Sequence, residues 1–555
     1  MTDQTLVRPG HARRLARVAA LFLVALTSRT QAQSDTLWQY SSPSKIVSRR
    51  LQQGSPQLLV ISEDHVVALD PGNGSVVWDV PHSIPVSFVS DDTLGHNLVG
   101  AGTSITAVDY RTGKQLWARS GFPHLDSSYV LLPDDGKMAL LQSGSSLWAF
   151  DPATGAAAWN SLEAMPGSVV RDFVLLRESG LVLLFLEGPG GKGSLAAVSR
   201  DSGTTRWHQD GLFSEAPAFR TRNGVSSLKN YQLLATRHDS LLVVYVTTDG
   251  PVRLDVVTGA ILWRSAALRG RKVAGVAQDY MPMCLCAGSI LVPVDRGVVA
   301  LDPETGTLRW EAPLPDKPTA ARRRPQGLLL FGLGVLKSYV TLLDSASGAP
   351  RWKLGLSDVD KVLLDRDSLL AAHDEKLLAI EIATGSQRIL AKVEFGDHEQ
   401  PRMLAPRPGG GYLLVSRQNL AAVGPEGLLY QRYFRAPPQS FGERLIATSI
   451  RRKGRAQLTP SVFYSLTDTP DASGVKYYSV VAVGTADGAE LRRLPVQSRD
   501  PDYVLDSWSG RIFLIVDNRR VVARTFALPK ELIPSGRDED TGAAADSAAF
   551  ATESP

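Results

Sequence analysis

The sequence is poor in cysteine. Of its 555 residues only two are cysteines, Cys284 and Cys286, in the segment PMCLCAG. Two cysteines exclude a disulfide framework and a four-cysteine zinc site, and neither is followed by the C-x-x-C-H pattern of c-type haem. In a regular strand, residues two apart lie about 6.6 Å apart on one face, which is the long limit for a disulfide. We expect two small buried hydrophobic residues; a disulfide is the alternative and would need a bend.

The chain has little excess charge. Lys and Arg number 60, against 56 Asp and Glu, and residues 1–32 hold five of the Arg and one of the acids. The remainder is therefore neutral, which argues against nucleic acid as a partner. The 43% hydrophobic and 21% charged contents are ordinary globular values, so wholesale disorder is excluded.

No apolar run after the N-terminus is long enough to span a membrane. The N-terminus itself has a basic segment (Arg8–Arg17), nine apolar residues (18–26) and small residues at Thr30 and Ala32. This is the pattern of a secretory signal peptide, and nine residues are too few for a membrane span. We predict a signal peptide at 1–32, cleaved and without a lipid-anchoring cysteine, and a periplasmic or secreted protein. An uncleaved anchor is the alternative.

A repeat occupies the rest of the chain. Each copy has an apolar pair, an acidic residue, a few turn residues, Gly, three more residues and Trp. The clear copies are ALDPGNGSVVW (68–78), AVDYRTGKQLW (107–117), AFDPATGAAAW (149–159), AVSRDSGTTRW (197–207), RLDVVTGAILW (253–263), ALDPETGTLRW (300–310) and LLDSASGAPRW (342–352). Residues 379–389 form an eighth copy without Trp, and weaker turns follow at 421–430 and 481–491. A period near 40–50 residues is typical of a propeller or a solenoid.

Each copy predicts two strands joined by a tight turn. The apolar residues before the acid alternate or are β-branched, the acid can bond turn backbone, and Gly accepts a positive φ. Two more apolar runs precede each copy, which gives four strands per repeat, as in a propeller blade. Because no long amphipathic helix appears, helical solenoids are disfavoured. The predicted fold class is an all-β propeller of four-stranded blades.

The D-x-x-[ST]-G-x-x-x-W pattern resembles the tryptophan-docking motif of quinoprotein (PQQ-like repeat) β-propellers. The resemblance implies a ring of blades, commonly eight, in which each Trp wedges between neighbouring blades. The acidic residues at the turns are then turn-formers and not catalytic acids. The residues assigned to blade docking are Trp78, Trp117, Trp159, Trp207, Trp263, Trp310 and Trp352.

The chain ends suggest how the propeller closes. The last hairpin has no strand ending in Trp after it, whereas Trp38 lies in such a strand with no turn before it. We predict that the Trp38 segment is the outer strand of the final blade, so that N- and C-terminal strands pair. Ten turn units and this closing unit give about eleven blades; an enlarged ring, two rings, and an inserted loop at 436–475 remain open. The domains are then a propeller at 33–534 and a disordered acidic, Ala-rich tail at 535–555.

The resemblance, and the points at which this sequence differs from the family's enzymes, indicate a function. Enzymes of this family hold pyrroloquinoline quinone and Ca²⁺ over the central axis, beneath a disulfide of adjacent cysteines. This chain has Cys-Leu-Cys instead, so we assign no catalytic, cofactor-binding or metal-binding residue and lean against an enzyme. The hypothesis is a monomeric, non-enzymatic scaffold that binds a protein partner in the cell envelope. Alternatives are a PQQ- and Ca-dependent alcohol or sugar dehydrogenase and a carbohydrate- or polymer-binding propeller.

Two basic runs stand apart from the repeat. Residues 322–324 (Arg-Arg-Arg) and 451–453 (Arg-Arg-Lys) are expected to be solvated loops. The alternative is contact with an acidic partner or with anionic lipid headgroups.

Overall fold

The computed structural model describes residues 36–526 apart from several short gaps. The gaps are residues 52–56, 83, 85, 90–94, 123–124, 126–128, 133–135, 217–218, 223–224, 229–230, 237–239, 247, 272–280, 295, 333–337, 357–360, 374, 395–402, 417–418, 434–456, 471–475, 497–501 and 507–509. The predicted signal peptide (1–32), the predicted tail (535–555) and the basic run 451–453 lie outside the described residues.

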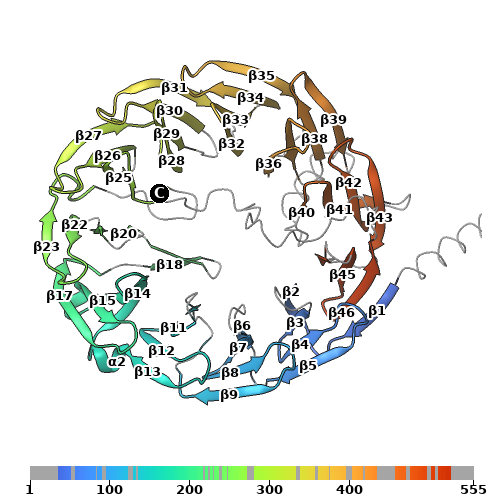
Figure 1. The fold of residues 1–555 in the computed structure, drawn as a ribbon, viewed down its shortest axis with the longest axis horizontal. Coiled ribbons are helices and arrows are strands. Elements are labelled where there is room, and N and C mark those ends of the chain that lie inside the picture. Colours follow the sequence, from blue (N-terminus) through green and yellow to red (C-terminus); the bar gives the residue numbers. More distant parts are fainter. Residues whose placement is uncertain are drawn as a thin grey trace, which may run out of the picture. The chain divides into compact units, whose positions relative to one another are not determined.

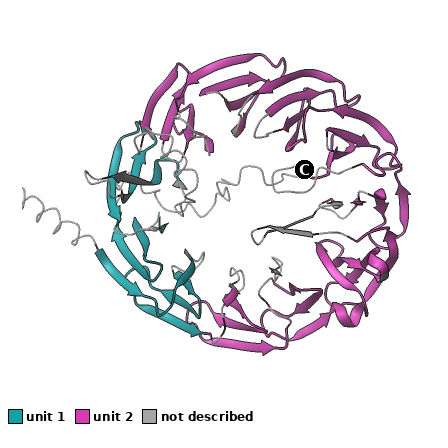
Figure 2. Cartoon of the chain, turned by 180° about the vertical axis from the view of Figure 1, so that it is seen from behind, with its two compact units in different colours: residues 1–81, 433–537 teal, residues 82–432, 538–555 magenta. Residues whose placement is uncertain are grey.

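The described residues form eleven four-stranded antiparallel sheets and one two-stranded sheet. Each four-stranded sheet is one blade, so the prediction of an all-β propeller with eight or more blades is confirmed. The chain divides into two compact units, coloured separately in Figure 2. Unit 1 holds residues 1–81 and 433–537, and unit 2 holds residues 82–432 and 538–555.

Unit 2 contains eight blades, each built from four consecutive strands. The first four blades are β6 (Val86–Val89), β7 (His96–Ala101), β8 (Ser104–Asp109), β9 (Gln115–Ser120); β10 (Tyr129–Leu131), β11 (Ala139–Ser143), β12 (Ser146–Phe150), β13 (Ala157–Asn160); β14 (Val169–Leu176), β15 (Leu181–Glu187), β16 (Gly193–Ser199), β17 (Thr205–Phe213); and β20 (Tyr231–Ala235), β21 (Leu242–Val246), β22 (Gly250–Leu254), β23 (Ile261–Arg264). The next four are β24 (Cys284–Cys286), β25 (Ser289–Val294), β26 (Gly297–Leu301), β27 (Leu308–Pro313); β28 (Ala320–Arg324), β29 (Gly327–Gly332), β30 (Ser338–Leu343), β31 (Pro350–Leu356); β32 (Lys361–Asp365), β33 (Ser368–His373), β34 (Lys376–Glu381), β35 (Gln387–Lys392); and β36 (Met403–Pro406), β37 (Tyr412–Val415), β38 (Asn419–Gly424), β39 (Gly427–Tyr433).

Three smaller elements interrupt this series. They are α2 (Ser161–Ala164), the 3-10 turn η1 (Pro189–Gly191), and the two-stranded sheet of β18 (Phe219–Arg222) and β19 (Val225–Leu228). Within unit 2, the fourth strand of each blade runs along the outside of the arc of blades, and the first strand lies on the inside (Figure 1).

Unit 1 contains three blades. Their strands are β2 (Ile46–Leu51), β3 (Leu58–Ser62), β4 (His65–Leu69), β5 (Val76–Pro81); β40 (Gln457–Leu458), β41 (Val462–Pro470), β42 (Lys476–Gly484), β43 (Glu490–Val496); and β44 (Asp502–Asp506), β45 (Arg511–Val516), β46 (Arg520–Thr525) with β1 (Thr36–Ser41). β1 pairs antiparallel with β46, and Trp38 lies opposite Ala523. The predicted pairing of N- and C-terminal strands is therefore confirmed.

One alternative that the sequence left open and one local prediction are wrong. Part of the segment expected as an inserted loop forms strands: β40 and β41 begin a complete blade, because Val462–Ser465 are buried core residues paired with β42. The run Arg322–Arg324 is not a loop but the end of β28, paired with β29. A first strand lies at a sheet edge, where charged side chains are tolerated.

The core lies between consecutive blades. Central strands such as β21 and β29 are buried on both faces, so they read as unbroken apolar runs. One cluster joins Leu183 and Phe185 of β15 to Val244 and Val252 of the following blade. Within each unit, consecutive blades therefore bury their facing sides against each other, as layered β-structures require.

Candidate functional site

The turn between the third and fourth strands is built by the acidic residue of the repeat. At Asp302, the Oδ1 atom accepts the backbone N–H groups of Glu304 (2.9 Å) and Thr305 (2.9 Å) and the Thr305 hydroxyl (3.1 Å). The N–H of Gly306 donates to the Asp302 carbonyl oxygen at 2.9 Å. Gly306 has φ of 68°, a conformation that glycine adopts without strain. The expectation that these acids form turns is confirmed.

Seven Trp residues pack on the turn of the following blade within their own unit. The Nε1–H of Trp263 donates to the carbonyl oxygen of Pro303, the residue directly after Asp302, at 3.0 Å. The indole face covers Gly306, where an added Cβ would lie 2.5 Å from Trp263 Cε3. The same pair of contacts recurs for Trp38 (Pro71, Gly74), Trp117 (Pro152, Gly155), Trp159 (Arg200, Gly203), Trp207 (Val256, Gly259), Trp310 (Ser345, Gly348) and Trp352 (Ile382, Gly385).

Trp78 is also buried, at 5% exposed, whereas Trp352 is only partly buried. Trp38 and the seven docking Trp residues, eight in all, are distributed one to a blade and do not gather into a single site. Their arrangement is that of repeated packing contacts, which a stacking platform for a planar ligand would not require.

A β-bulge directs each docking Trp inward. In the β22–β23 pair, Arg253 lies opposite Trp263 and Leu254 lies opposite Ile261, so Leu262 is the extra residue. The same shift precedes Trp78, Trp117, Trp159, Trp207, Trp310 and Trp352. A bulge re-aims neighbouring side chains. It therefore buries the Trp while leaving both preceding residues exposed.

Two bulge positions hold arginines that bond back to the turn. Arg309 Nη2 lies 2.7 Å from Asp302 Oδ2, and Arg351 Nη2 lies 2.9 Å from Asp344 Oδ2. Hydrogen bonds from Arg309, followed by those from the turn, lower the pKa of Asp302 to about 2. The pKa of Asp344 is lowered likewise, first of all by Arg351. These carboxylates stay ionised and serve as acceptors, so they are unsuited to act as proton-transfer groups at neutral pH.

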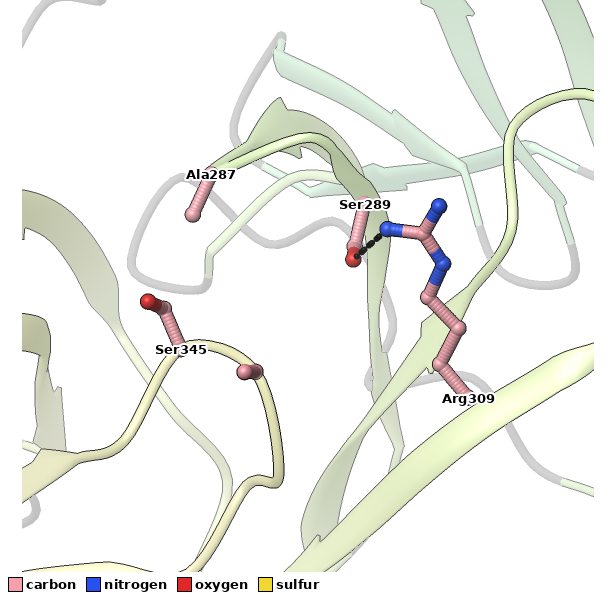
Figure 3. A pocket seen from close by; sticks show the side chains of 5 residues that line it. Ala287, Ser289, Arg309 and Ser345 are labelled. Carbon is pink, nitrogen blue, oxygen red and sulfur yellow. Dashed lines mark hydrogen bonds between the residues drawn. The ribbon is translucent and has the colours of Figure 1, made fainter.

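A shallow depression of about 440 Å³ adjoins Arg309, the arginine of the first of these pairs (Figure 3). Ala287, Ser289, Arg309, Ser345 and Ala346 line it. Arg309 Nη1 donates to Gly288 O (2.7 Å) and Ser289 Oγ (3.0 Å). Since Arg309 also bonds Asp302, its guanidinium is held in protein contacts, and the depression offers only two serine hydroxyls and small apolar side chains.

Cys284 and Cys286 lie on β24 with free thiols of intermediate exposure. A hydrogen bond between the two thiols raises the pKa of Cys284 and lowers that of Cys286. Arg322 and Arg323 on β28 also lower the pKa of Cys286. The expectation of two buried small hydrophobic residues is therefore only partly met, because both thiols are partly exposed and interact.

The described residues do not fit a quinone–calcium site. Calcium prefers six to eight oxygen ligands, including carboxylates, yet in the described parts of the chain no three His, Cys, Asp or Glu side chains gather. The cysteines also alternate with Leu285 and are not adjacent.

The outer strands supply a feature that the repeat pattern did not predict. Large aliphatic side chains on the fourth strands of unit 2 are between 43% and 53% exposed: Leu116, Ile261, Leu262, Leu308, Ile389, Leu428 and Leu429. For Leu116, Ile261, Leu262 and Leu308 the signal was present as apolar residues before Trp. Strict alternation along the strand would have buried one of the two residues before each Trp, and the bulge leaves both exposed.

Comparisons with membrane spans and with known proteins give the following results. Among the described residues, no helix combines the length and apolar character that a membrane crossing requires. No curated protein matches the sequence. Similar solved structures include BamB from Moraxella catarrhalis, with 14% identity over 64% of this chain and 98% of that chain and a TM-score of 0.30. They also include a europium-containing methanol dehydrogenase, with 14% identity over 70% of this chain and 84% of that chain and a TM-score of 0.29.

A family model supplies the remaining comparison. The model described as outer membrane protein assembly factor BamB matches residues 62–210 and 191–423. This match covers more than half of the chain and includes all seven Trp-ended repeats. The chain therefore belongs to the PQQ-like repeat propeller family described as outer membrane protein assembly factor BamB.

Proposed function

We propose that the protein is a non-enzymatic module outside the cytoplasm that binds extended segments of partner proteins along the outer strands of its blades. The family description, which refers to outer membrane protein assembly, and the signal-like N-terminus support the location and the general role. The exposed fourth strands carry the proposal.

The backbone of the fourth strands favours strand addition. In each described blade of unit 2 the fourth strand ends the sheet and pairs with the third strand alone. Such an edge presents backbone N–H and C=O groups on its other side. An extended peptide can pair with them and place alternate side chains on the blade. Main-chain pairing would supply affinity for many sequences.

The side chains of these strands favour apolar partners. β23 exposes Ile261 at 43% and Leu262 at 51%, and β27 exposes Leu308 at 50%. Proteins usually protect edges with charged residues or proline, and exposed aliphatic residues along an edge are typical of interaction surfaces. β17 differs, because Arg206 occupies its bulge position. Aliphatic edges and basic edges in one chain allow a matched comparison.

The experiment places a photo-crosslinking residue, p-benzoylphenylalanine, at the bulge position of single strands in cells. Leu262→p-benzoylphenylalanine and Leu116→p-benzoylphenylalanine should give adducts with envelope or outer-membrane proteins, identified by mass spectrometry. The Arg206→p-benzoylphenylalanine control, at the same structural position with a polar native residue, should give at least about tenfold less adduct.

Two results would contradict the proposal. One is the absence of protein adducts at both aliphatic positions. The other is equal yield at all three positions, which would indicate diffusive contact. A second variant pair, Ile261→Glu with Leu262→Glu, places charges on the edge and should abolish partner binding without lowering the melting temperature.

A further inference from the structure

Cys284 and Cys286 form a pair of parallel thiols at the inner edge of one blade. They lie opposite Leu291 and Ser289 in the β24–β25 ladder. Residues two apart on a strand project to the same face. Both side chains accordingly pack against one hydrophobic cluster, together with Met281. The two thiols also influence each other's pKa, raising that of Cys284 and lowering that of Cys286.

The ladder opposes closure of this pair into a disulfide. Pairing of both cysteines with β25 keeps β24 extended, so their Cα atoms are separated by about 6.6 Å. That separation lies at the upper limit for disulfides. The strand therefore holds two thiols side by side in the dithiol form, and their intermediate exposure leaves them open to a small solute.

A third sulfur lies in the same cluster. Met281 is 2% exposed, and its backbone N–H donates to Pro318 O at 3.0 Å, which fixes the segment before β24. Thiolate and thioether sulfurs are soft ligands and select Cu(I). Zinc instead requires four ligands, and within the described residues no third His, Cys, Asp or Glu joins the cysteines.

The local charge suits the same ion. A Cu(I) ion bound by two thiolates carries a net charge of −1. Arg322 and Arg323 of β28 act electrostatically on Cys286, and Arg322 also acts on Cys284. Two guanidinium groups near the sulfurs stabilise an anionic complex in a partly buried site.

We propose that Cys284 and Cys286 bind one Cu(I) ion, with Met281 as the third sulfur ligand. This site is independent of the protein-binding function proposed above. It lies on the first strand of its blade, whereas the proposed partner surface lies on the fourth strands.

The test uses the purified mature chain, reduced and kept anaerobic. Cu(I), supplied as its acetonitrile complex, competes with bicinchoninate for the protein. The expected result is one Cu(I) per chain with a sulfur-only first shell by X-ray absorption. Because the chain holds two cysteines in all, any thiolate signal reports this site. Cys284→Ser and Cys286→Ser each remove a ligand. Each should lower the Cu(I) affinity by more than the roughly 10–100-fold that is typical of changes outside the ligand shell.

Methionine variants test the third ligand. Met281→Leu, which conserves volume, should weaken binding about tenfold. Met403→Leu, on another blade, is the matched control and should leave affinity unchanged. Unchanged affinity in Met281→Leu would remove Met281 from the site. Circular dichroism and melting curves establish that every variant is folded.

Two outcomes would overturn the two-cysteine site. One is a Cu(I) affinity of the wild type no greater than that of the Cys284→Ser/Cys286→Ser double variant. The other is a 2 Da mass loss that occurs in air without added copper and removes both free thiols, because a readily formed disulfide would contradict the extended geometry of β24.

Discussion

At the scale of single residues, one acid and one glycine organise each turn. Asp302 bonds two backbone N–H groups and a hydroxyl, and Gly306 leaves room for the indole of Trp263. Neither residue lines the depression beside Arg309. The recurring chemistry of the repeat builds the turn, and the turn forms the surface on which the Trp of the preceding blade docks.

Gly306→Ala should destabilise the protein by more than about 2 kcal/mol. A left-handed backbone costs a non-glycine residue roughly 1–2 kcal/mol, and the new Cβ would lie 2.5 Å from Trp263. Gly180→Ala is the control, since Gly180 has φ of 63° and no atom within 4 Å of an added Cβ. This variant should lose only the stability that a left-handed backbone costs a non-glycine residue. Urea unfolding measures both, and equal losses would show that the indole contact contributes nothing.

The Asp302–Arg309 pair should make stability depend on acidity. The pKa of Asp302 is lowered to about 2 in the folded state, against about 3.9 when unfolded. Its contribution is thus fully present above pH ~4 and is lost as the pH falls toward 2. Asp302→Asn should lower the urea midpoint at pH 7, and its difference from wild type should shrink through pH 3 and disappear only as the pH approaches 2.

Asp151→Asn is the control for this effect. Ala158 stands seven residues after Asp151, where Arg309 follows Asp302, so the variant lacks the ion-pair component. A difference between Asp302→Asn and wild type that stays constant from pH 7 to pH 3 would contradict the linkage.

At the scale of elements, the contact between a fourth strand and the next turn repeats along the chain. Each contact joins one indole N–H to a backbone carbonyl and covers a glycine. Because the contact recurs in the same form at seven Trp residues, its energetic role can be measured at one position.

Trp263→Ala should cost roughly 3–5 kcal/mol, as expected for a large buried aromatic side chain. Trp263→Phe keeps most of the ring and removes only the 3.0 Å indole bond to Pro303 O, which still accepts from Arg253 Nη1 at 2.7 Å. It should therefore cost less, about 0.5–1.5 kcal/mol. Denaturant titrations distinguish the two variants. Losses below 0.5 kcal/mol for both would refute a docking role for this residue.

The terminal strand β1 should be needed for stability. Deletion of residues 33–45 removes the partner of β46 and the indole that bonds Pro71, so the melting temperature should fall sharply. Trp38→Ala, which keeps the β1 ladder, should lower it less. Differential scanning calorimetry measures both, and an unchanged melting temperature after the deletion would exclude a closing role for β1.

At the scale of the whole molecule, the repeat resembles that of quinone enzymes, but the described residues lack a calcium site of the kind those enzymes have. No three His, Cys, Asp or Glu side chains gather among them. Titration of the mature protein with pyrroloquinoline quinone and Ca²⁺ should leave Trp fluorescence unquenched and give no dye-linked alcohol oxidation. Ca²⁺-dependent quenching with turnover would instead establish a dehydrogenase. Retention on immobilised polysaccharide would favour the carbohydrate-binding alternative.

Much of this architecture could be predicted from the sequence because its signals are local. The acid, the glycine and the Trp lie within eleven residues, so one turn and two strands follow from short-range chemistry. The repetition of this unit indicates a propeller, and the unmatched Trp38 segment predicts the pairing with β46. The alternative of an inserted loop at 436–475 is wrong for residues 457–470, which form β40 and β41. The sequence left it open because β40–β43 lack a docking Trp; packing against the blade of β44–β46 defines these strands.

Other features depend on atoms far apart in the sequence. Each indole N–H donates to a carbonyl oxygen that lies some 30–49 residues further along the chain. This pairing forms only when consecutive blades pack together. The bulge that exposes Leu262 exists only in the ladder with β22, and Arg322 reaches Cys286 only because β28 follows β24 in space. The sequence by itself determined the blade, because its turn chemistry is local. Only the tertiary structure decided the exposed edges and the thiol pair, because side-chain direction and proximity are set by strand pairing and blade packing.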